Sequence, residues 1–183
     1  TPTTNGDQPP ISPATPRADP RDARQERFAR TFANVVAVLM RDPGFRNLPL
    51  AELEWLVLPP IMSGQWRLAQ STAPTPAGKS GAKAQSSHVV PVAVALWASV
   101  SAEIDTRLAN SLDKPLTLKP NEWASGDNLW MIAVAGDPRA VPKFLKQLAE
   151  TQFKGRQVKL RANGADGKVI VTTLEAHSAS PSA

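Results

Sequence analysis

The sequence predicts an α/β fold of the α+β kind: a single domain whose mixed central sheet is flanked by helices. Two nearly continuous apolar runs, "HVVPVAVALWASV" and "NLWMIAVAG", are typical of strands buried on both faces. Amphipathic helical patterns stand before, between and after these runs. The expected order is helix, helix, strand, strand, helix, strand, helix, strand, strand, which lacks the strict alternation of a doubly wound fold.

The first half of the predicted domain begins with helices. Residues 22–41 repeat apolar side chains at helical spacing, and Asp42-Pro-Gly ends that pattern. A second short helix is expected after Pro49 and should stop at Pro59-Pro60. The next segment, "IMSGQWRLAQS", is predicted to be a strand, and the small polar residues 71–87 to be a flexible insert.

The second half alternates strands and helices less regularly. Pro91 removes a backbone donor, so it is expected at the start of its strand or at a bulge. "SAEIDTRLANSL" predicts a helix, and Pro138 is expected to start another. "RQVKLRA" and "VIVTTLEA" flank the turn "NGADGK", which predicts a hairpin.

Composition narrows the class of protein. The 183 residues contain no cysteine, which excludes disulfides, a thiolate nucleophile and sulfur ligands for zinc. The 18 prolines cluster at the front, so 1–21 is expected to be a disordered leader, 22–176 the domain and 177–183 a loose tail. His88 and His177 are too few for a histidine-rich metal site, and no metal is expected.

Charge and hydropathy suggest partners and location. The net charge of +5 favours acidic partners, although a modest cationic excess also serves solubility alone. Basic and aromatic residues do not interleave in a nucleic-acid motif, so nucleic-acid binding is not favoured. No apolar stretch predicts a transmembrane segment, and a cytoplasmic location is expected.

The segment "NEWASGDNLWMI" offers a candidate site. If Trp123 and Trp130 wall Asp127, its carboxylate is partly desolvated, and strand ends in such sheets often bind ligands. The alternative is structural, because Ser-Gly-Asp is a common turn in which the aspartate caps its own backbone. Trp66 and Trp97, on presumed strands, are most simply core residues.

From about Phe32 to Leu174 the chain resembles the toxin-activating lysine acyltransferases, the companion proteins of RTX haemolysin operons. Four collinear segments carry the resemblance: "RDPGFRNLPLAELEWLVLPPIMSGQWRLAQ", "PVAVALWASVSAEIDTRL", "EWASGDNLWMI" and "GKVIVTTLE". The resemblance implies a fold related to the GCN5-type N-acetyltransferases. It also implies fatty acyl transfer from acyl carrier protein to internal lysines of an RTX-type protoxin or similar client, with no resident cofactor and a possible homodimer.

The resemblance also implies the site. Asp127 inherits a catalytic role by its position in the Ser-Gly-Asp motif. Substrate-binding roles are expected for seven positions: Arg46, Gln65, Trp97, Trp123, Ser125, Gly126 and Trp130.

One position departs from the family. The catalytic histidine precedes the family's Arg-Asn pair, and Phe45 occupies that place here. Three alternatives follow: Asp127 serves alone as base with help from positioning, His88 substitutes, or the protein only binds an acyl carrier protein or a client.

Overall fold

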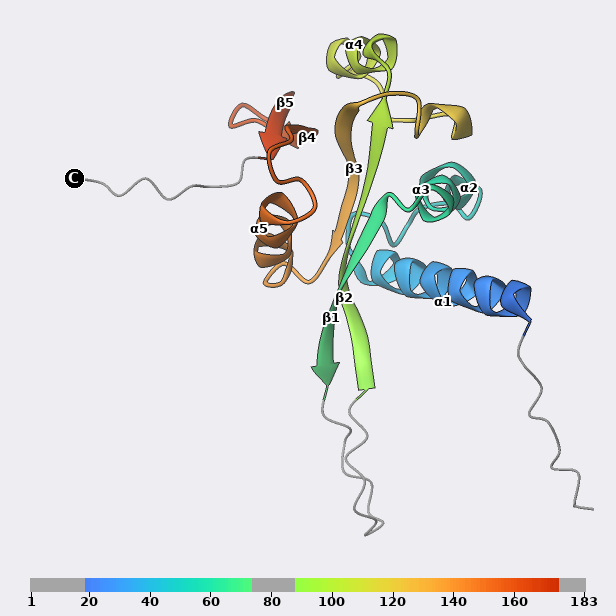
Figure 1. The fold of residues 1–183 in the computed structure, drawn as a ribbon. Coiled ribbons are helices and arrows are strands. Elements are labelled where there is room, and N and C mark those ends of the chain that lie inside the picture. Colours follow the sequence, from blue (N-terminus) through green and yellow to red (C-terminus); the bar gives the residue numbers. More distant parts are fainter. Residues whose placement is uncertain (1–18, 74–87, 175–183) are drawn as a thin grey trace, which may run out of the picture.

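The computed structural model describes residues 19–73 and 88–174 (Figure 1). Its centre is one five-stranded sheet in the order β1-β2-β3-β4-β5. The strands are β1 (Trp66–Ala73), β2 (His88–Val100), β3 (Asn128–Gly136), β4 (Val158–Asn163) and β5 (Val169–Leu174). All neighbours pair antiparallel except β3 and β4, which pair parallel, so the sheet is mixed.

Helices cover both faces of this sheet. In Figure 1 the α5 helix (Val141–Glu150) lies on one side of β3, whereas α1 (Pro20–Arg41), α2 (Glu52–Leu56) and α3 (Leu58–Ser63) lie on the other. The α4 helix (Ala102–Asn110) and the short 3-10 helix η1 (Pro120–Glu122) gather where β2 ends and β3 begins. Helices begin where their sequences allow: the Asp19 carboxylate accepts from the Arg21 N–H, and Ser101 Oγ accepts from the Ile104 N–H.

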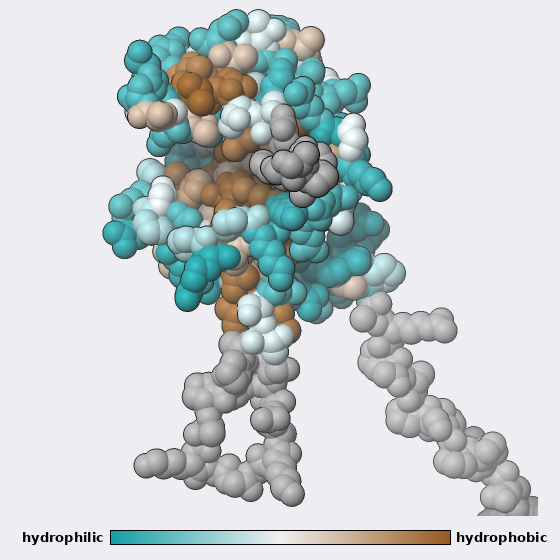
Figure 2. Space-filling view, turned by 90° about the vertical axis from the view of Figure 1, so that its left-hand side faces the viewer, coloured by the Kyte–Doolittle hydropathy of each residue, from teal (hydrophilic) through white to brown (hydrophobic). Residues whose placement is uncertain are grey.

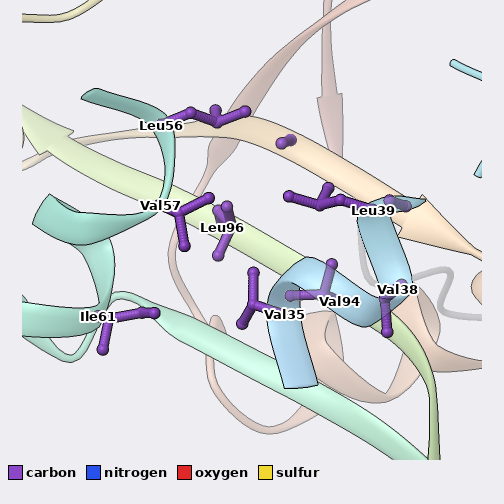
Figure 3. Packing of buried hydrophobic residues seen from close by; sticks show 10 residues of the cluster. Val35, Val38, Leu39, Leu56, Val57, Ile61, Val94 and Leu96 are labelled. Carbon is purple, nitrogen blue, oxygen red and sulfur yellow. The ribbon is translucent and has the colours of Figure 1, made fainter. Parts of the chain in front are cut away.

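Three apolar clusters make the core. The first joins α1 and the 56–61 segment to β2, and Figure 3 shows their side chains converging on Val94 and Leu96. The second lies beneath α5 and contains Trp97, Phe144 and Phe153. The third fills the end of the sheet below α4. Its buried members are Ala98, Val100, Ile104, Leu108, Leu118, Trp123 and Trp130.

The structure corrects several expected boundaries. Pro59 and Pro60 do not end a helix before a strand, because they occupy the first turn of α3, where a missing backbone N–H costs nothing. Gly64, with φ of 74°, then ends α3, and β1 starts only at Trp66. The α5 helix begins at Val141 rather than Pro138, and it too has a proline in its first turn.

Other boundaries move by a few residues. The α1 helix begins at Pro20, so two residues assigned to the leader are helical, and β1 takes the first three residues of the expected insert. The prediction for Pro91 is confirmed, because the β1–β2 register shifts between Ala69 and Gln70, opposite it. Residues 1–18, 74–87 and 175–183, with His177 among them, lie outside the described residues.

The expected fold class is confirmed: this is a mixed α+β domain with a central sheet flanked by helices, consistent with an N-acetyltransferase-like domain. Across the ranges that the structure covers, every helix is too short or too polar to cross a membrane.

Candidate functional site

The Ser125–Asp127 turn is fastened to the end of β2. Ser99 makes this attachment with its backbone: its N–H donates to the Trp123 carbonyl, and its carbonyl accepts from the N–H groups of Ser125 and Gly126. Ala124 forms a parallel bridge with Ser99, which adds a short extra strand segment at this point. The turn therefore has a fixed position relative to the sheet.

Ser125 and Gly126 have structural reasons for their identity. Ser125 Oγ donates to the Glu122 carbonyl and accepts from the Ser101 N–H, each at 2.9 Å. A Cβ on Gly126 would lie 2.6 Å from the Val100 carbonyl oxygen, which is too close for any side chain. Both residues hold the turn against the β2–α4 junction, and their substrate-binding roles stay predictions.

Glu122 is the buried ionic centre of this region. Both its carboxylate oxygens accept from the Arg107 guanidinium, at 2.8 and 2.7 Å, and one also accepts from the Lys119 N–H. The hydrogen bonds from Arg107 hold the pKa of the Glu122 carboxyl below its ordinary range, although burial acts in the opposite direction. The sequence reasoning missed this pair because its partners are 15 residues apart.

Asp127 does not have the predicted surroundings. Its side chain is exposed, and its backbone carbonyl accepts from Arg156 at 3.4 Å. Trp123 and Trp130 are 1% and 0% exposed, so both are core residues rather than the walls of a ligand site. The Trp130 indole N–H donates to Asp105 at 2.7 Å. The expectation of a partly desolvated Asp127 carboxylate is therefore wrong.

The remaining predicted binding residues divide between several places. Gln65 is 9% exposed, and its amide donates to Ser99 Oγ at 2.7 Å, so it joins the same assembly as the Ser125 turn. Trp97 lies on the opposite face of the sheet, where its ring meets Phe153 edge-on at 5.0 Å. Arg46 is exposed.

Phe45 lies near the other end of β3. Its N–H donates to the Asp42 carbonyl, and the Asp42 carboxylate accepts from the Gly136 N–H at 2.9 Å. Phe45 is half-buried against the first apolar cluster, which includes Ala133 and Ala135 of β3. The sequence reasoning assigned Asp42 to a helix stop alone, whereas it also anchors the end of a central strand.

Comparison with known proteins identifies the family. A model of the RTX toxin acyltransferase family (HlyC) matches residues 83–174, half of the chain. The chain belongs to this family. No match was found among curated proteins.

For this member of the RTX toxin acyltransferase family, the resemblance assigns positions 45 and 127 to one mechanism. Asp127 precedes the first residue of β3, whereas the carboxylate of Asp42, three residues before Phe45, accepts from the N–H of the last residue of β3. At about 3.3 Å per residue, this strand is roughly 25 Å long. Asp127 and the Asp42 contact therefore lie at opposite ends of this strand.

The sheet of this family member opens beside β3. β4 pairs with β3 only over Leu129–Met131, and beyond that point β3 continues to Gly136 with β2 as its partner. The β2–β3 register also shifts between Leu96 and Trp97, which places Ile132 in a bulge where the β3–β4 pairing ends. The parallel strands β3 and β4 thus diverge next to this bulge.

Two further predictions concern histidine and metals. His88 is the first residue of β2, where its backbone pairs with Ala73, and its role as a substitute base stays a prediction. Within 19–73 and 88–174, no three histidine, aspartate or glutamate side chains are grouped to hold a metal ion.

Proposed function

We propose that this protein transfers an acyl group from acyl carrier protein to a lysine side chain of an RTX-type protoxin or similar client. In this reaction the lysine amine attacks the thioester carbonyl carbon, the carbon–sulfur bond breaks, and the carrier leaves as a thiolate. The attacking nitrogen loses a proton to a carboxylate base, which passes it to the thiolate, so no resident cofactor is needed. The family match over residues 83–174 is the observation that carries this proposal.

The divergence of β3 and β4 supports acyl binding. The apolar side chains around it are only partly buried, as a slot for a hydrocarbon chain requires. They come from β3, α5, β4 and β5: Val134, Val141, Leu145, Leu160 and Leu174. Figure 2, which views this side of the molecule, shows hydrophobic surface in a hollow between more hydrophilic blocks.

Surface charge near this opening suits an acidic carrier. Arg139, Lys143 and Lys146 are exposed at the start of α5 and along it. Arg139 and Lys146 have surface partners in Asp137 and Glu150, but these exposed pairs are open to exchange with a partner's carboxylates. Complementary charge of this kind raises association rates more than affinity.

We assign the proton-accepting role to Asp127 and the larger share of catalysis to positioning. The structure places no imidazole at position 45, where Phe45 stands. Loss of general-base help typically costs about 10²–10⁴-fold, whereas alignment of donor and amine still supplies much of the rate. The protein is therefore expected to be a slow acyltransferase.

The test is acyl transfer in a purified system. An acyl carrier protein charged with fatty acids of several lengths is incubated with the protein and an RTX protoxin, and the protoxin is measured by intact mass. The protoxin should gain the mass of one or more acyl groups. No gain with any chain length, while an active family enzyme labels the same protoxin, would contradict the proposal.

One observation favours a second function, binding of carrier or client without turnover. The resemblance assigns the family's histidine to the position of Phe45, which is half-buried against the apolar cluster that includes Ala133 and Ala135. This cluster offers no group that takes up a proton. Carrier binding by calorimetry, together with no acyl gain on the protoxin, would establish this function instead. A cytoplasmic location and a homodimer stay predictions under either function.

A further inference from the structure

A cavity of about 650 Å³ lies between α4, the segment that follows it and β4. Four cationic side chains contribute to its lining: Arg107, Lys114, Lys119 and Arg161. Leu108 and Leu118, both 3% exposed, provide an apolar floor. The cavity is on the α4 face of the sheet, whereas the apolar slot proposed for the acyl chain adjoins α5.

The charges of this cavity are unbalanced. Glu122 also lines it, but both its oxygens are occupied by Arg107. In the portion of the chain that the structure covers, neither Lys114, Lys119 nor Arg161 has a carboxylate oxygen within 4.0 Å. Against the larger effect of burial, the negative charge of Asp113 acts on Arg161 and raises its pKa. The cavity therefore holds an excess of positive charge.

Arg161 is fixed in place. Its guanidinium donates to the carbonyls of Lys114, Leu108 and Ser111 at 2.8, 2.8 and 3.0 Å. Burial lowers the pKa of the Arg161 guanidinium, which means that its charge is incompletely solvated, while Asp113 opposes this shift. A rigid, partly desolvated cation is a preorganised partner for an anion, because its side-chain entropy is already lost.

The apolar floor and the cationic side chains of the cavity together limit the class of ligand that fits it. A small inorganic anion would use the cations but leave the leucine floor uncovered. A nucleic-acid strand would bring continuous negative charge past Asp113 and Glu122, and bases would find no aromatic side chain among the cavity's lining residues to stack on. An acidic peptide satisfies both parts, because it carries carboxylates and apolar side chains together.

We propose that this cavity binds an acidic peptide segment of another protein. Carboxylates of the peptide pair with Lys114, Lys119 and Arg161, and one of its apolar side chains covers Leu108 and Leu118. The proposal rests on the proposed function only in identifying the peptide's parent protein as the acylated client. The cavity wall leads from Lys119 and Glu122 directly into the turn that ends at Asp127. A client held here would present its lysine beside that turn.

The test uses a fluorescein-labelled dodecapeptide of aspartate and glutamate with a central leucine, and measures binding by anisotropy. Lys114 and Lys119 are exposed, so the double variant Lys114→Gln/Lys119→Gln should fold normally. Loss of two partly exposed charge contacts should weaken binding about five- to tenfold. The matched control, Arg24→Gln/Arg27→Gln on α1, removes the same charge from exposed positions and should bind like the parent.

Three results would overturn the inference. The first is equal affinity of the parent and the Lys114/Lys119 variant. The second is equal binding of a peptide whose acidic residues are replaced by asparagine and glutamine. The third is tighter binding of a DNA oligonucleotide than of the peptide at the same salt concentration.

Acyl transfer separates this inference from the proposed function. Peptide binding that depends on Lys114 and Lys119, in a protein that transfers no acyl group, would retain the cavity's role and reject the activity. Acyl transfer to a protoxin at an unchanged KM in the double variant would retain the activity and reject the cavity's role in client binding.

Discussion

The two ends of β3 differ in the chemistry that surrounds them. At the beginning, Ser125 and Gly126 are held by hydrogen bonds to Ser99 and Ser101, with the Glu122–Arg107 pair beneath. At the other end, Phe45 packs against an apolar cluster, and Asp42 supplies a single anchor to Gly136.

Hydrogen bonds and an ion pair therefore surround the beginning of β3, whereas apolar packing surrounds Phe45 at its other end. The Ser-Gly-Asp end has a network in which backbone hydrogen bonds hold the turn and the Arg107–Glu122 side-chain pair lies beside it. At the other end, Phe45 is half-buried against the first apolar cluster. We propose that the proton acceptor of the reaction lies at the Asp127 end of the strand.

Replacement of Gly126 should give the largest effect, because it tests whether the turn depends on close packing. In Gly126→Ala, the new Cβ would meet the Val100 carbonyl at 2.6 Å and Ser101 Cα at 2.7 Å. Since both are backbone atoms, the strain should lower the free energy of unfolding by about 2–3 kcal/mol. Urea denaturation measures this.

The matched control for that variant is Gly164→Ala. Its Cβ would first meet the flexible Asp166 carboxylate, at 3.1 Å, so the cost should stay below about 1 kcal/mol. Similar losses in the two variants would show that the turn is not tightly packed on β2.

Glu122→Gln should have the next largest effect, because it removes the half-buried ion pair with Arg107 at this end of β3. At pH 7 the free energy of unfolding should fall by about 1–2 kcal/mol, less than for a fully buried pair. The ion pair stabilises less than a fully buried one because the Arg107 side chain is 42% exposed and water screens its charge.

The effect should depend on pH. Because Arg107 lowers the pKa of the Glu122 carboxyl in the folded protein, the pair stabilises the fold fully above the unfolded-state value of about 4.3. This stabilisation is lost as pH falls through the lower pKa of the folded state. The difference between parent and Glu122→Gln should therefore shrink in denaturation curves at pH 3, and a constant difference would argue against the ion pair.

Phe45→His tests the apolar end. An imidazole there would lose contact with the first cluster, so the free energy of unfolding should fall by about 1 kcal/mol. Position 45 packs against the first apolar cluster, so acyl transfer to a protoxin should not increase. Phe45→Leu, which keeps an apolar side chain, is the control. A clear gain in rate with histidine would show that the two ends cooperate after all.

Asp127→Asn should change stability least. The side chain is exposed, so the free energy of unfolding should move by no more than about 0.5 kcal/mol. A loss of more than 1 kcal/mol, about twice that bound, would mean that the carboxylate caps its own turn.

Local patterns predicted most of the fold. Burial on both faces gives β2 and β3 continuous apolar runs, which the sequence shows directly. Helical spacing of apolar residues likewise predicts α4, because this pattern also lies within a few residues. The α3 helix was missed because two adjacent prolines indicate a helix end as readily as a helix start.

The site was less predictable because its geometry is non-local. Trp130 was expected beside Asp127, but its ring is buried and its indole N–H donates to Asp105, 25 residues earlier. The Arg107–Glu122 pair and the Asp42–Gly136 contact likewise join residues that no local pattern connects. Sequence motifs located the turn, but only the packed structure shows which of its side chains face solvent.

The proposed role of Asp127 is to accept the proton during acyl transfer. The most direct test is the single-turnover rate of acyl transfer to a protoxin at saturating acyl carrier protein, measured for the parent and for Asp127→Asn. We expect measurable transfer by the parent and a decrease of about 10²-fold in the variant, the lower end of what general-base catalysis contributes. No transfer by a parent that binds the carrier, or equal rates in both proteins, would contradict the account.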